Sequence, residues 1–386
     1  MQWPPSREFW LKIVILLMTL LAIGAEVYAR WCGFMLTSDS LQYLSAARSF
    51  RAAGVFLSPD GSHYAYWPPL YPLLINLFND PVQSLIAINI ACKLAIGWLV
   101  YLLGRRYLSR TATRVAFAAG VLFGLHLLLI SVFVWSELVF VSLALALLYR
   151  LTCCPDRLFS GAPLVLGFLL CLQRNAGVFW IAGICSSWLL GRGWSLRNVA
   201  EAGVFFLLST SGMWAWNAGN TWLIDADFAF YDQPFLSALG GNSRIAGSSL
   251  AAAFVPASNH IFWAVIFWIF MAAGAWTAWK FRSSNLVAPV VLALVYCAGF
   301  VLMGPLDVYE ADRYFCVVPM VVYLPLLRAL EWLCGRFAIA SRVLVVVLLV
   351  CSVYPLVRMG RNAQRWHERS CAVPPTPETL MQPQIN

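Results

Sequence analysis

The segment Thr37–Tyr71, TSDSLQYLSAARSFRAAGVFLSPDGSHYAYWPPLY, separates two long apolar runs and is far more polar than either of them. Ser38, Asp39 or Ser40 can cap a helix here, because apolar residues follow at near-helical spacing until Gly54 ends the pattern. Asp39 would then lie at the mouth of the helix, where free backbone N–H groups favour a carboxylate. The segment therefore predicts a short capped helix with an acid at its start; the plainer interpretation is an ordinary loop outside the membrane.

The rest of the chain is too apolar for a soluble protein. Of its 386 residues, 61% are hydrophobic and 11% are charged, whereas soluble proteins carry about 25% charged residues. At about 20 apolar residues for each crossing, the apolar runs predict an all-α polytopic membrane protein with about 11 transmembrane helices. The net charge of +9 comes mostly from Arg residues in short loops between apolar runs. That pattern is typical of topology signals and not of nucleic-acid binding.

The densest basic loop, RRYLSRTATR at 105–114, determines the predicted orientation. Positive charge accumulates in cytoplasmic loops. The N-terminus is therefore expected inside the cell, and the loop 31–80, with short membrane-surface helices, outside. Two further outer loops are expected at 223–260 and 305–314. We assign all of these loops to one transmembrane domain, residues 1–357.

A short polar tail that contains prolines, residues 358–386, follows this domain. Its Arg residues favour the cytoplasm, whereas an odd number of crossings places the tail outside. Most of the eleven cysteines lie inside apolar runs, and none forms a C-x-x-C pair. We therefore predict that they are small hydrophobic side chains and not a disulfide framework.

A few ionisable residues lie within or beside the apolar runs, where a charge is costly enough to suggest a function. Glu137 follows an outer turn, Arg174 lies at the next one, and Arg313 directly precedes an apolar run. Together with Asp39 and Asn217, these residues are all expected near the outer leaflet. Each alone also fits a structural hydrogen bond or an interfacial anchor, but their shared location favours one site.

The residue types suggest a reaction between a membrane lipid and a molecule outside the cell. A carboxylate such as Asp39 can accept the proton of an attacking hydroxyl group, as a general base must. Two guanidinium groups, those of Arg174 and Arg313, can hold a lipid phosphate and stabilise its charge as it leaves. The four histidines are scattered, so their spacing does not support a divalent metal. No other cofactor is predicted.

A series of short motifs extends from the first predicted outer loop to the last. The motifs are Ser38-Asp39-Ser40-Leu41-Gln42-Tyr43, Ala47-Arg48, Gly54, Trp67-Pro68-Pro69-Leu70-Tyr71-Pro72, Ser136-Glu137-Leu138, Arg174-Asn175-Ala176-Gly177, Trp216-Asn217, and Arg313-Tyr314 with Pro319. In order and spacing, this series resembles the GT-C class of membrane glycosyltransferases. The resemblance is to the branch that contains the dolichyl-phosphate-mannose-protein mannosyltransferases and ArnT-like enzymes.

The resemblance implies a sugar donor linked to a polyprenyl phosphate, a hydroxyl-bearing acceptor, and transfer outside the cell with Asp39 as catalytic base. For the donor phosphate and lipid we predict contacts with Arg174, Arg313, Tyr314 and Arg48. For the sugar or the acceptor we predict contacts with Tyr43, His63, Tyr66, Trp67, Tyr71, Glu137, Asn217 and Glu310. Members of the class often carry two adjacent acids where this chain has Asp39 and Ser40, which leaves metal use open.

Two other functional classes fit the same composition. A transporter or flippase of lipid-linked saccharides would explain the basic residues and the many crossings, but the chain shows no internal repeat. A non-catalytic subunit that binds lipid is the other alternative. In each case we expect a multi-pass protein of the plasma membrane, or of the inner membrane if bacterial, in contact with membrane lipids. The enzyme interpretation places the active site on the extracytoplasmic side.

Overall fold

The computed structural model is an all-α bundle, and its described residues contain no β-strand beyond two isolated bridges. The structure describes residues 7–65, 67–153, 158–224, 235–254, 261–280, 286–302, 306, 310–336 and 340–372. The helices are α1 (Arg7–Ala29), α2 (Ser38–Ala53), α3 (Leu70–Ile75), α4 (Pro81–Tyr107), α5 (Thr111–Leu122), α6 (Leu125–Val132), α7 (Glu137–Cys153), α8 (Gly161–Gln173), α9 (Gly177–Arg192), α10 (Leu196–Ile224), α11 (Phe235–Ala252), α12 (Phe262–Lys280), α13 (Val287–Leu302), α14 (Ala311–Tyr314), α15 (Val317–Arg336) and α16 (Ala340–Ala372).

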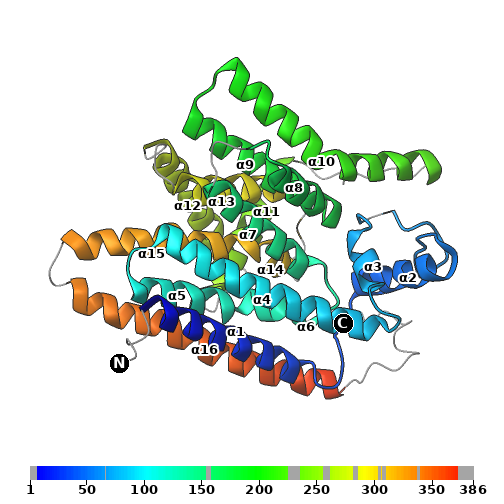
Figure 1. The fold of residues 1–386 in the computed structure, drawn as a ribbon, viewed down its shortest axis with the longest axis horizontal. Helices are drawn as coiled ribbons and strands as arrows, with labels where there is room; N and C mark the ends of the chain where they lie inside the picture. Colours follow the sequence, from blue (N-terminus) through cyan, green and yellow to red (C-terminus); the bar gives the residue numbers. More distant parts are fainter. Residues whose placement is uncertain are drawn as a thin grey trace, which may run out of the picture.

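The long helices are apolar and lie beside one another, as a membrane bundle requires. Helices α1, α4, α15 and α16 run alongside each other, and α8, α9, α12 and α13 form the part of the bundle above them (Figure 1). Within the described part of the chain, five segments are long and apolar enough to cross a membrane: α1, α4, α5 with α6, α12 and α15. The predicted class of an all-α polytopic membrane protein is confirmed, whereas the number of about 11 crossings stays a prediction.

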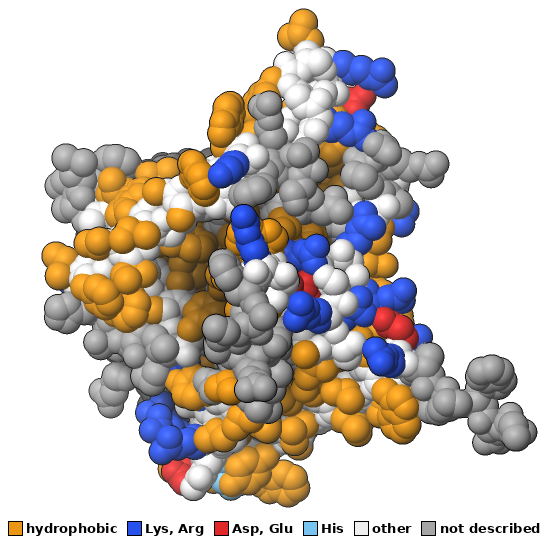
Figure 2. Space-filling model, turned by 90° about the vertical axis from the view of Figure 1, so that its left-hand side faces the viewer, with side chains coloured by type: hydrophobic (Ala, Val, Ile, Leu, Met, Phe, Trp, Pro, Cys, Tyr) orange, Lys and Arg blue, Asp and Glu red, His pale blue; other side chains and the backbone are white. Residues whose placement is uncertain are grey.

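The two ends of the bundle differ in charge. Helices α4, α7, α9, α12 and α15 each have a basic residue in the last turn. Figure 2 views the molecule from the end where α4 and α15 finish, and Lys and Arg side chains gather there. Helices α2 and α3 lie at the opposite end (Figure 1). The predicted basic loop 105–114 and the predicted outer loop 31–80 are therefore at opposite ends of the bundle.

The N-cap residue of α2 precedes all three of the predicted cap residues. Thr37 is the N-cap residue: its Oγ1 accepts a hydrogen bond from the Ser40 N–H at 3.4 Å, and Ser40 Oγ accepts one from the Thr37 N–H at 3.0 Å. This reciprocal capping box satisfies the exposed N–H groups. The prediction that Ser38, Asp39 or Ser40 supplies the cap is wrong, and Asp39 is not needed for that purpose. Gly54 ends the helix with a left-handed backbone, as predicted.

A disulfide bond joins Cys32, just after α1, to Cys371 in the last turn of α16. The prediction that the cysteines form no disulfide is wrong for this pair, whose partners are separated by 339 residues in sequence. Seven other cysteines in the described part of the chain carry thiols and not disulfides: Cys92, Cys153, Cys171, Cys185, Cys297, Cys316 and Cys334. Helix α16 continues to Ala372, so the first half of the predicted tail is helical. The C-terminal end of α16 lies at the same end of the bundle as α2, which is the end expected outside the cell. The Arg residues of this segment had favoured the cytoplasmic end.

Two of the predicted loop regions are only partly described. Helix α11 (Phe235–Ala252) occupies the middle of the predicted loop 223–260, and α14 (Ala311–Tyr314) ends the predicted loop 305–314. Residues 225–234, 255–260, 305 and 307–309 lie outside the described residues.

A buried ion cluster connects α1, α4 and α6. Glu26 pairs with Lys93 at 2.7 Å and with Arg30 at 2.9 Å. The Asn89 amide donates to Glu26 and to the Ser131 carbonyl, both at 2.9 Å. A buried charge is tolerated when it is paired and hydrogen-bonded, and here the pairing fixes the end of α6. The residues that follow α6 enter the candidate active site.

Candidate active site

Four charged side chains that sequence analysis placed near one another meet in the structure. Asp39 comes from the first turn of α2, Glu137 from the start of α7, Arg174 from the residue that ends α8, and Arg313 from α14. Arg313 Nε donates to Glu137 Oε1 at 2.7 Å, and Arg313 Nη2 donates to Asp39 Oδ2. Arg174 Nη1 forms an ion pair with the same Glu137 oxygen.

Glu310 is the third carboxylate of this charged cluster. It accepts a hydrogen bond from Arg313 Nη1 at 3.2 Å and another from the Tyr314 hydroxyl. The Glu310 side chain is 29% exposed, whereas that of Arg313 is 1% exposed. All three guanidinium nitrogens of Arg313 thus donate to carboxylates, and Glu310 is the partner nearest to solvent.

The cluster carries one more negative than positive charge: three carboxylates, of Asp39, Glu137 and Glu310, face two guanidinium groups. Burial makes an isolated charge costly, so a paired arrangement of this kind is stable only with good hydrogen-bond geometry. The second oxygen of Glu137, Oε2, is buried and has no hydrogen-bond partner among the described residues. An acceptor atom of this kind is suited to bind a substrate hydroxyl group.

Aromatic rings cover the guanidinium groups. Arg313 Cζ lies 4.7 Å from the centre of the Trp135 ring and 5.2 Å from that of Tyr314, and Arg174 Cζ lies 5.7 Å from Tyr314. Such contacts contribute to holding a guanidinium plane in one orientation. Trp135 also donates from Nε1 to Thr37 Oγ1 at 2.9 Å, so it contacts the cap of the helix that carries Asp39.

Tyr43 connects α2 to the start of α7. Its hydroxyl is 3.2 Å from Ser136 Oγ, which also lies 3.5 Å from Arg174 Nη1. Burial raises the pKa of the Tyr43 phenol well above its ordinary value, mainly through desolvation of the charged form. The phenol therefore stays protonated and acts as a hydrogen-bonding group, not as a base.

An aromatic wall extends from Tyr43 away from the charged cluster. The Tyr43 ring lies 5.8 Å from Trp67 and 5.0 Å from Tyr71, and Tyr64 lies 6.3 Å from Trp67 and 6.4 Å from Trp216. Three predicted sugar or acceptor residues, Tyr43, Trp67 and Tyr71, are thus brought together. Trp216 of α10 completes the wall, next to the predicted Asn217 on the same helix.

Two other predicted residues, Arg48 and His63, form none of the contacts of the charged cluster described above. Arg48 is exposed on α2, and no ion pair recorded for the described residues includes it. His63 is exposed in the loop before α3, where its backbone pairs with Leu57. Tyr66 lies outside the described residues. The described part of the chain contains no group of three or more His, Cys, Asp or Glu residues arranged to hold a metal ion.

Sequence analysis missed several residues that line the charged cluster. Trp135 directly precedes the Ser136-Glu137 motif, and Gln173, which donates from Nε2 to the Ser136 carbonyl at 3.0 Å, precedes Arg174. The signal in the sequence that could have identified Trp135 and Gln173 was their position directly before predicted site residues. His126 of α6 lies 3.8 Å from Asp312, the neighbour of Arg313. Nothing in its sequence context predicted that contact.

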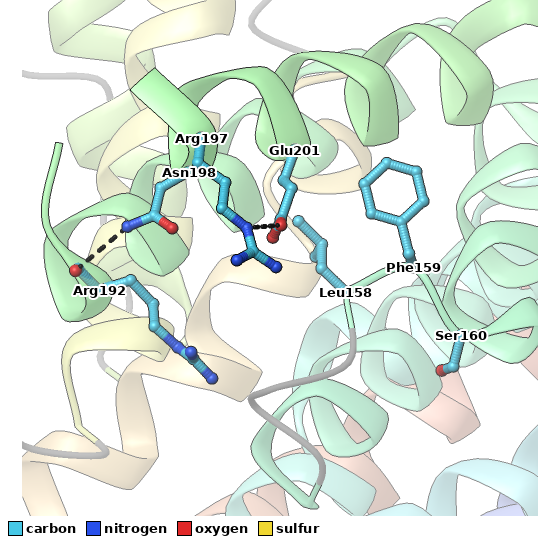
Figure 3. A pocket seen from close by; sticks show the side chains of 7 residues that line it. All are labelled: Leu158, Phe159, Ser160, Arg192, Arg197, Asn198 and Glu201. Atoms are coloured by element: carbon cyan, nitrogen blue, oxygen red, sulfur yellow. Dashed lines mark hydrogen bonds and ion pairs between the residues drawn. The ribbon is translucent and has the colours of Figure 1, made fainter. Parts of the chain in front are cut away.

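A separate pocket of about 690 Å³ lies at the other end of α8 (Figure 3). Arg192, Arg197, Asn198 and Glu201 point into it beside residues 158–160, and Arg197 pairs with Glu201 at 3.0 Å. Helix α8 begins beside this pocket and ends at Arg174, so its 13 residues separate the pocket from the charged cluster. At 1.5 Å per residue that is about 20 Å. The pocket is therefore not part of the candidate active site.

The arrangement of helices is that of the ArnT-like GT-C fold, as the motif series predicted. The chain is similar to the crystal structure of ArnT from Cupriavidus metallidurans bound to undecaprenyl phosphate, with a TM-score of 0.60 and 14% sequence identity. The similarity covers 97% of this chain and 76% of the ArnT chain. No family model and no curated protein matches the chain significantly. At this level of identity the likeness shows the fold alone.

Proposed function

We propose that this protein is a membrane glycosyltransferase that moves a sugar from a polyprenyl-phosphate-linked donor to a hydroxyl-bearing acceptor on the extracytoplasmic face. The observation that carries the proposal is the position of Asp39. It does not cap α2 but turns into a buried cluster, where Arg313 Nη2 donates to it. The fold is shared with ArnT, whose crystal structure contains undecaprenyl phosphate.

In the proposed reaction Asp39 is the general base. It takes the proton of the acceptor hydroxyl as the hydroxyl oxygen forms a bond to the anomeric carbon of the sugar. The bond between that carbon and the phosphate oxygen breaks, and the electron pair leaves with the polyprenyl phosphate. The free Oε2 of Glu137 would accept a hydrogen bond from a hydroxyl of the sugar or the acceptor. The aromatic wall of Tyr43, Trp67 and Tyr71 would pack against a sugar face.

The donor phosphate would bind at the position that the Glu310 carboxylate occupies in the structure. Glu310 accepts from Arg313 Nη1 and from the Tyr314 hydroxyl, two of the groups predicted to bind phosphate. It is also the most exposed carboxylate of the cluster. A phosphate that displaced it would gain both donors, while Asp39 and Glu137 kept their contacts with Arg313. Charge-assisted hydrogen bonds of this kind suit both carboxylates and phosphates.

Two observations support an extracytoplasmic active site. The Cys32–Cys371 disulfide lies at the end of the bundle that holds α2, and disulfides persist in oxidising compartments. The basic last turns of α4, α7, α9 and α15 lie at the other end, as expected for the cytoplasmic side.

We expect a membrane-impermeant maleimide to label Ser62→Cys in intact cells and to label Ala112→Cys only after permeabilisation. Ser62 and Ala112 are exposed at opposite ends of the bundle. Both variants should be made in a Cys153→Ser background, which removes the one free cysteine that is exposed among the described residues and keeps the disulfide. Labelling of Ala112→Cys from outside intact cells would reverse the proposed orientation.

The function itself is tested by mass spectrometry of cell-envelope glycans and glycoproteins, with and without the gene, followed by transfer assays on the purified protein. A glycosyltransferase should release polyprenyl phosphate and glycosylated acceptor in detergent, where no membrane separates two compartments. A flippase of lipid-linked saccharides would give no transfer in detergent and would move the donor between the leaflets of vesicles. That second outcome would replace the proposal.

A further inference from the structure

The end of α16 is fixed to the end of α1 by a covalent bond and three weaker contacts. Beside the Cys32–Cys371 disulfide, Ser370 Oγ donates to the Ala29 carbonyl at 3.2 Å. The His367 ring stacks on Tyr28 with 4.4 Å between ring centres, and its Nδ1 lies 3.0 Å from the Tyr28 carbonyl. This end of α16 is therefore held in one position relative to the residues that lead into α2.

A row of aromatic rings runs from this fixed end into the charged cluster. Trp366 meets Phe133 edge to face at 5.2 Å, and Phe133 stacks on Trp135 at 4.2 Å with 9° between the ring planes. Trp135 in turn covers the Arg313 guanidinium at 4.7 Å. Three aromatic side chains thus connect α16 to the arginine that Asp39 and Glu137 share.

The segment that carries Phe133 and Trp135 is also attached to the residues before Asp39. The Met35 N–H donates to the Val132 carbonyl at 3.1 Å, and the Val134 N–H donates to the Met35 carbonyl at 3.3 Å. Trp135 Nε1 donates to Thr37 Oγ1, the cap of α2. A shift of Trp135 would therefore change the position of Arg313 and of the helix that carries Asp39 together.

We propose that Trp366 is a positioning residue of the active site, and that the disulfide-locked end of α16 sets the orientation of Trp135 and through it of Arg313. Packed interiors transmit small shifts because they have few voids. Displacements of about 1 Å at a reacting centre can cost about 100-fold in rate. The activity test of this inference rests on the proposed function. The predicted change in local structure can be measured whether or not the protein transfers sugar.

The first test compares Trp366→Leu with Trp366→Phe. We expect Trp366→Leu to lower kcat for sugar transfer by roughly 10- to 100-fold while KM for the donor changes less than about threefold. Trp366→Phe keeps an aromatic face against Phe133 and should retain most of the rate. Arg365→Gln, an exposed position on the same turn of α16, is the matched control and should transfer sugar normally. If Trp366→Leu also transfers sugar normally, the inference is wrong.

The second test measures hydrogen exchange, which does not depend on activity. In Trp366→Leu and in Cys371→Ser, exchange should become faster at the amides of 35–41 and 132–137 and stay unchanged in α9, α12 and α13. Cys153→Ser replaces an exposed free cysteine, leaves the disulfide intact, and is the control for a Cys-to-Ser replacement as such. Faster exchange throughout the chain would mean a merely structural role and would overturn the inference. If the wild-type protein transfers no sugar but the local exchange result holds, the proposed function fails and the positioning role stands.

Discussion

Asp39→Asn is expected to purify as a folded protein, to bind the polyprenyl-phosphate-linked donor, and to lose roughly 10²- to 10⁴-fold in the rate of sugar transfer. The physical reason is that the Asn amide cannot accept the proton of the acceptor hydroxyl, which is the role for which Asp39 needs a carboxylate. Thr37 caps α2, so the helix keeps its cap. An Asn oxygen can still accept from Arg313 Nη2, which donates to Asp39 in the native protein. The two remaining carboxylates then balance the two guanidinium groups of the cluster.

The measurement is a comparison of kcat, donor KM and thermal stability in wild type and variant. Asp60→Asn is a suitable control, since Asp60 is an exposed acid in the same loop and bonds only to Ser62 among the described residues. It should transfer sugar normally. Near-normal transfer by Asp39→Asn would remove Asp39 from the role of base. Glu137 would then be the next candidate, because its Oε2 is buried without a hydrogen-bond partner in the described part of the chain.

The sequence was sufficient to predict the class of fold and the members of the charged cluster. Long apolar runs indicate helices that cross a membrane. A charged residue within or beside such a run is costly enough to suggest a function. The charge rule identified Glu137, Arg174 and Arg313, and the helix-start pattern identified Asp39; the structure brings these four residues into contact. The end of α2 at Gly54 was also predicted, and the structure shows it with the αL backbone that glycine adopts freely.

The pairing within the cluster was not predictable from the same information. Arg313 and Asp39 are separated by 274 residues, and Cys32 and Cys371 by 339, so no local pattern connects them. The cap was assigned to Ser38, Asp39 or Ser40 and not to Thr37, because Thr, Ser and Asp all have similar preferences for a helix start. Trp135 was missed because a Trp beside an apolar run usually marks the membrane interface. Its contact with Arg313 depends on how α6, α7 and α14 pack together.

Arg313→Lys should lower kcat for sugar transfer by roughly 100-fold and weaken donor binding, although the charge is kept. An arginine fork donates from three nitrogens in fixed directions, whereas a lysine ammonium is a single point on a flexible chain. In the structure those three nitrogens reach Asp39, Glu137 and Glu310. Lysine cannot hold all three carboxylates, so Asp39 loses its fixed orientation and the donor phosphate loses one of its donors. Arg197→Lys, at a side chain that is 87% exposed, is the control and should behave as wild type.

Glu310→Gln is expected to have the opposite effect on donor binding. It removes the carboxylate that accepts hydrogen bonds from Arg313 Nη1 and the Tyr314 hydroxyl. A phosphate then no longer competes with a negative charge for these donors. A gain of about 1 kcal/mol corresponds to a donor KM that is lower by roughly fivefold. Titration of both variants with polyprenyl phosphate alone separates the two effects, because binding is measured without transfer. If Arg313→Lys binds polyprenyl phosphate as tightly as wild type and Glu310→Gln binds it no more tightly, the phosphate lies elsewhere, and Arg313 serves only to orient the acids around it.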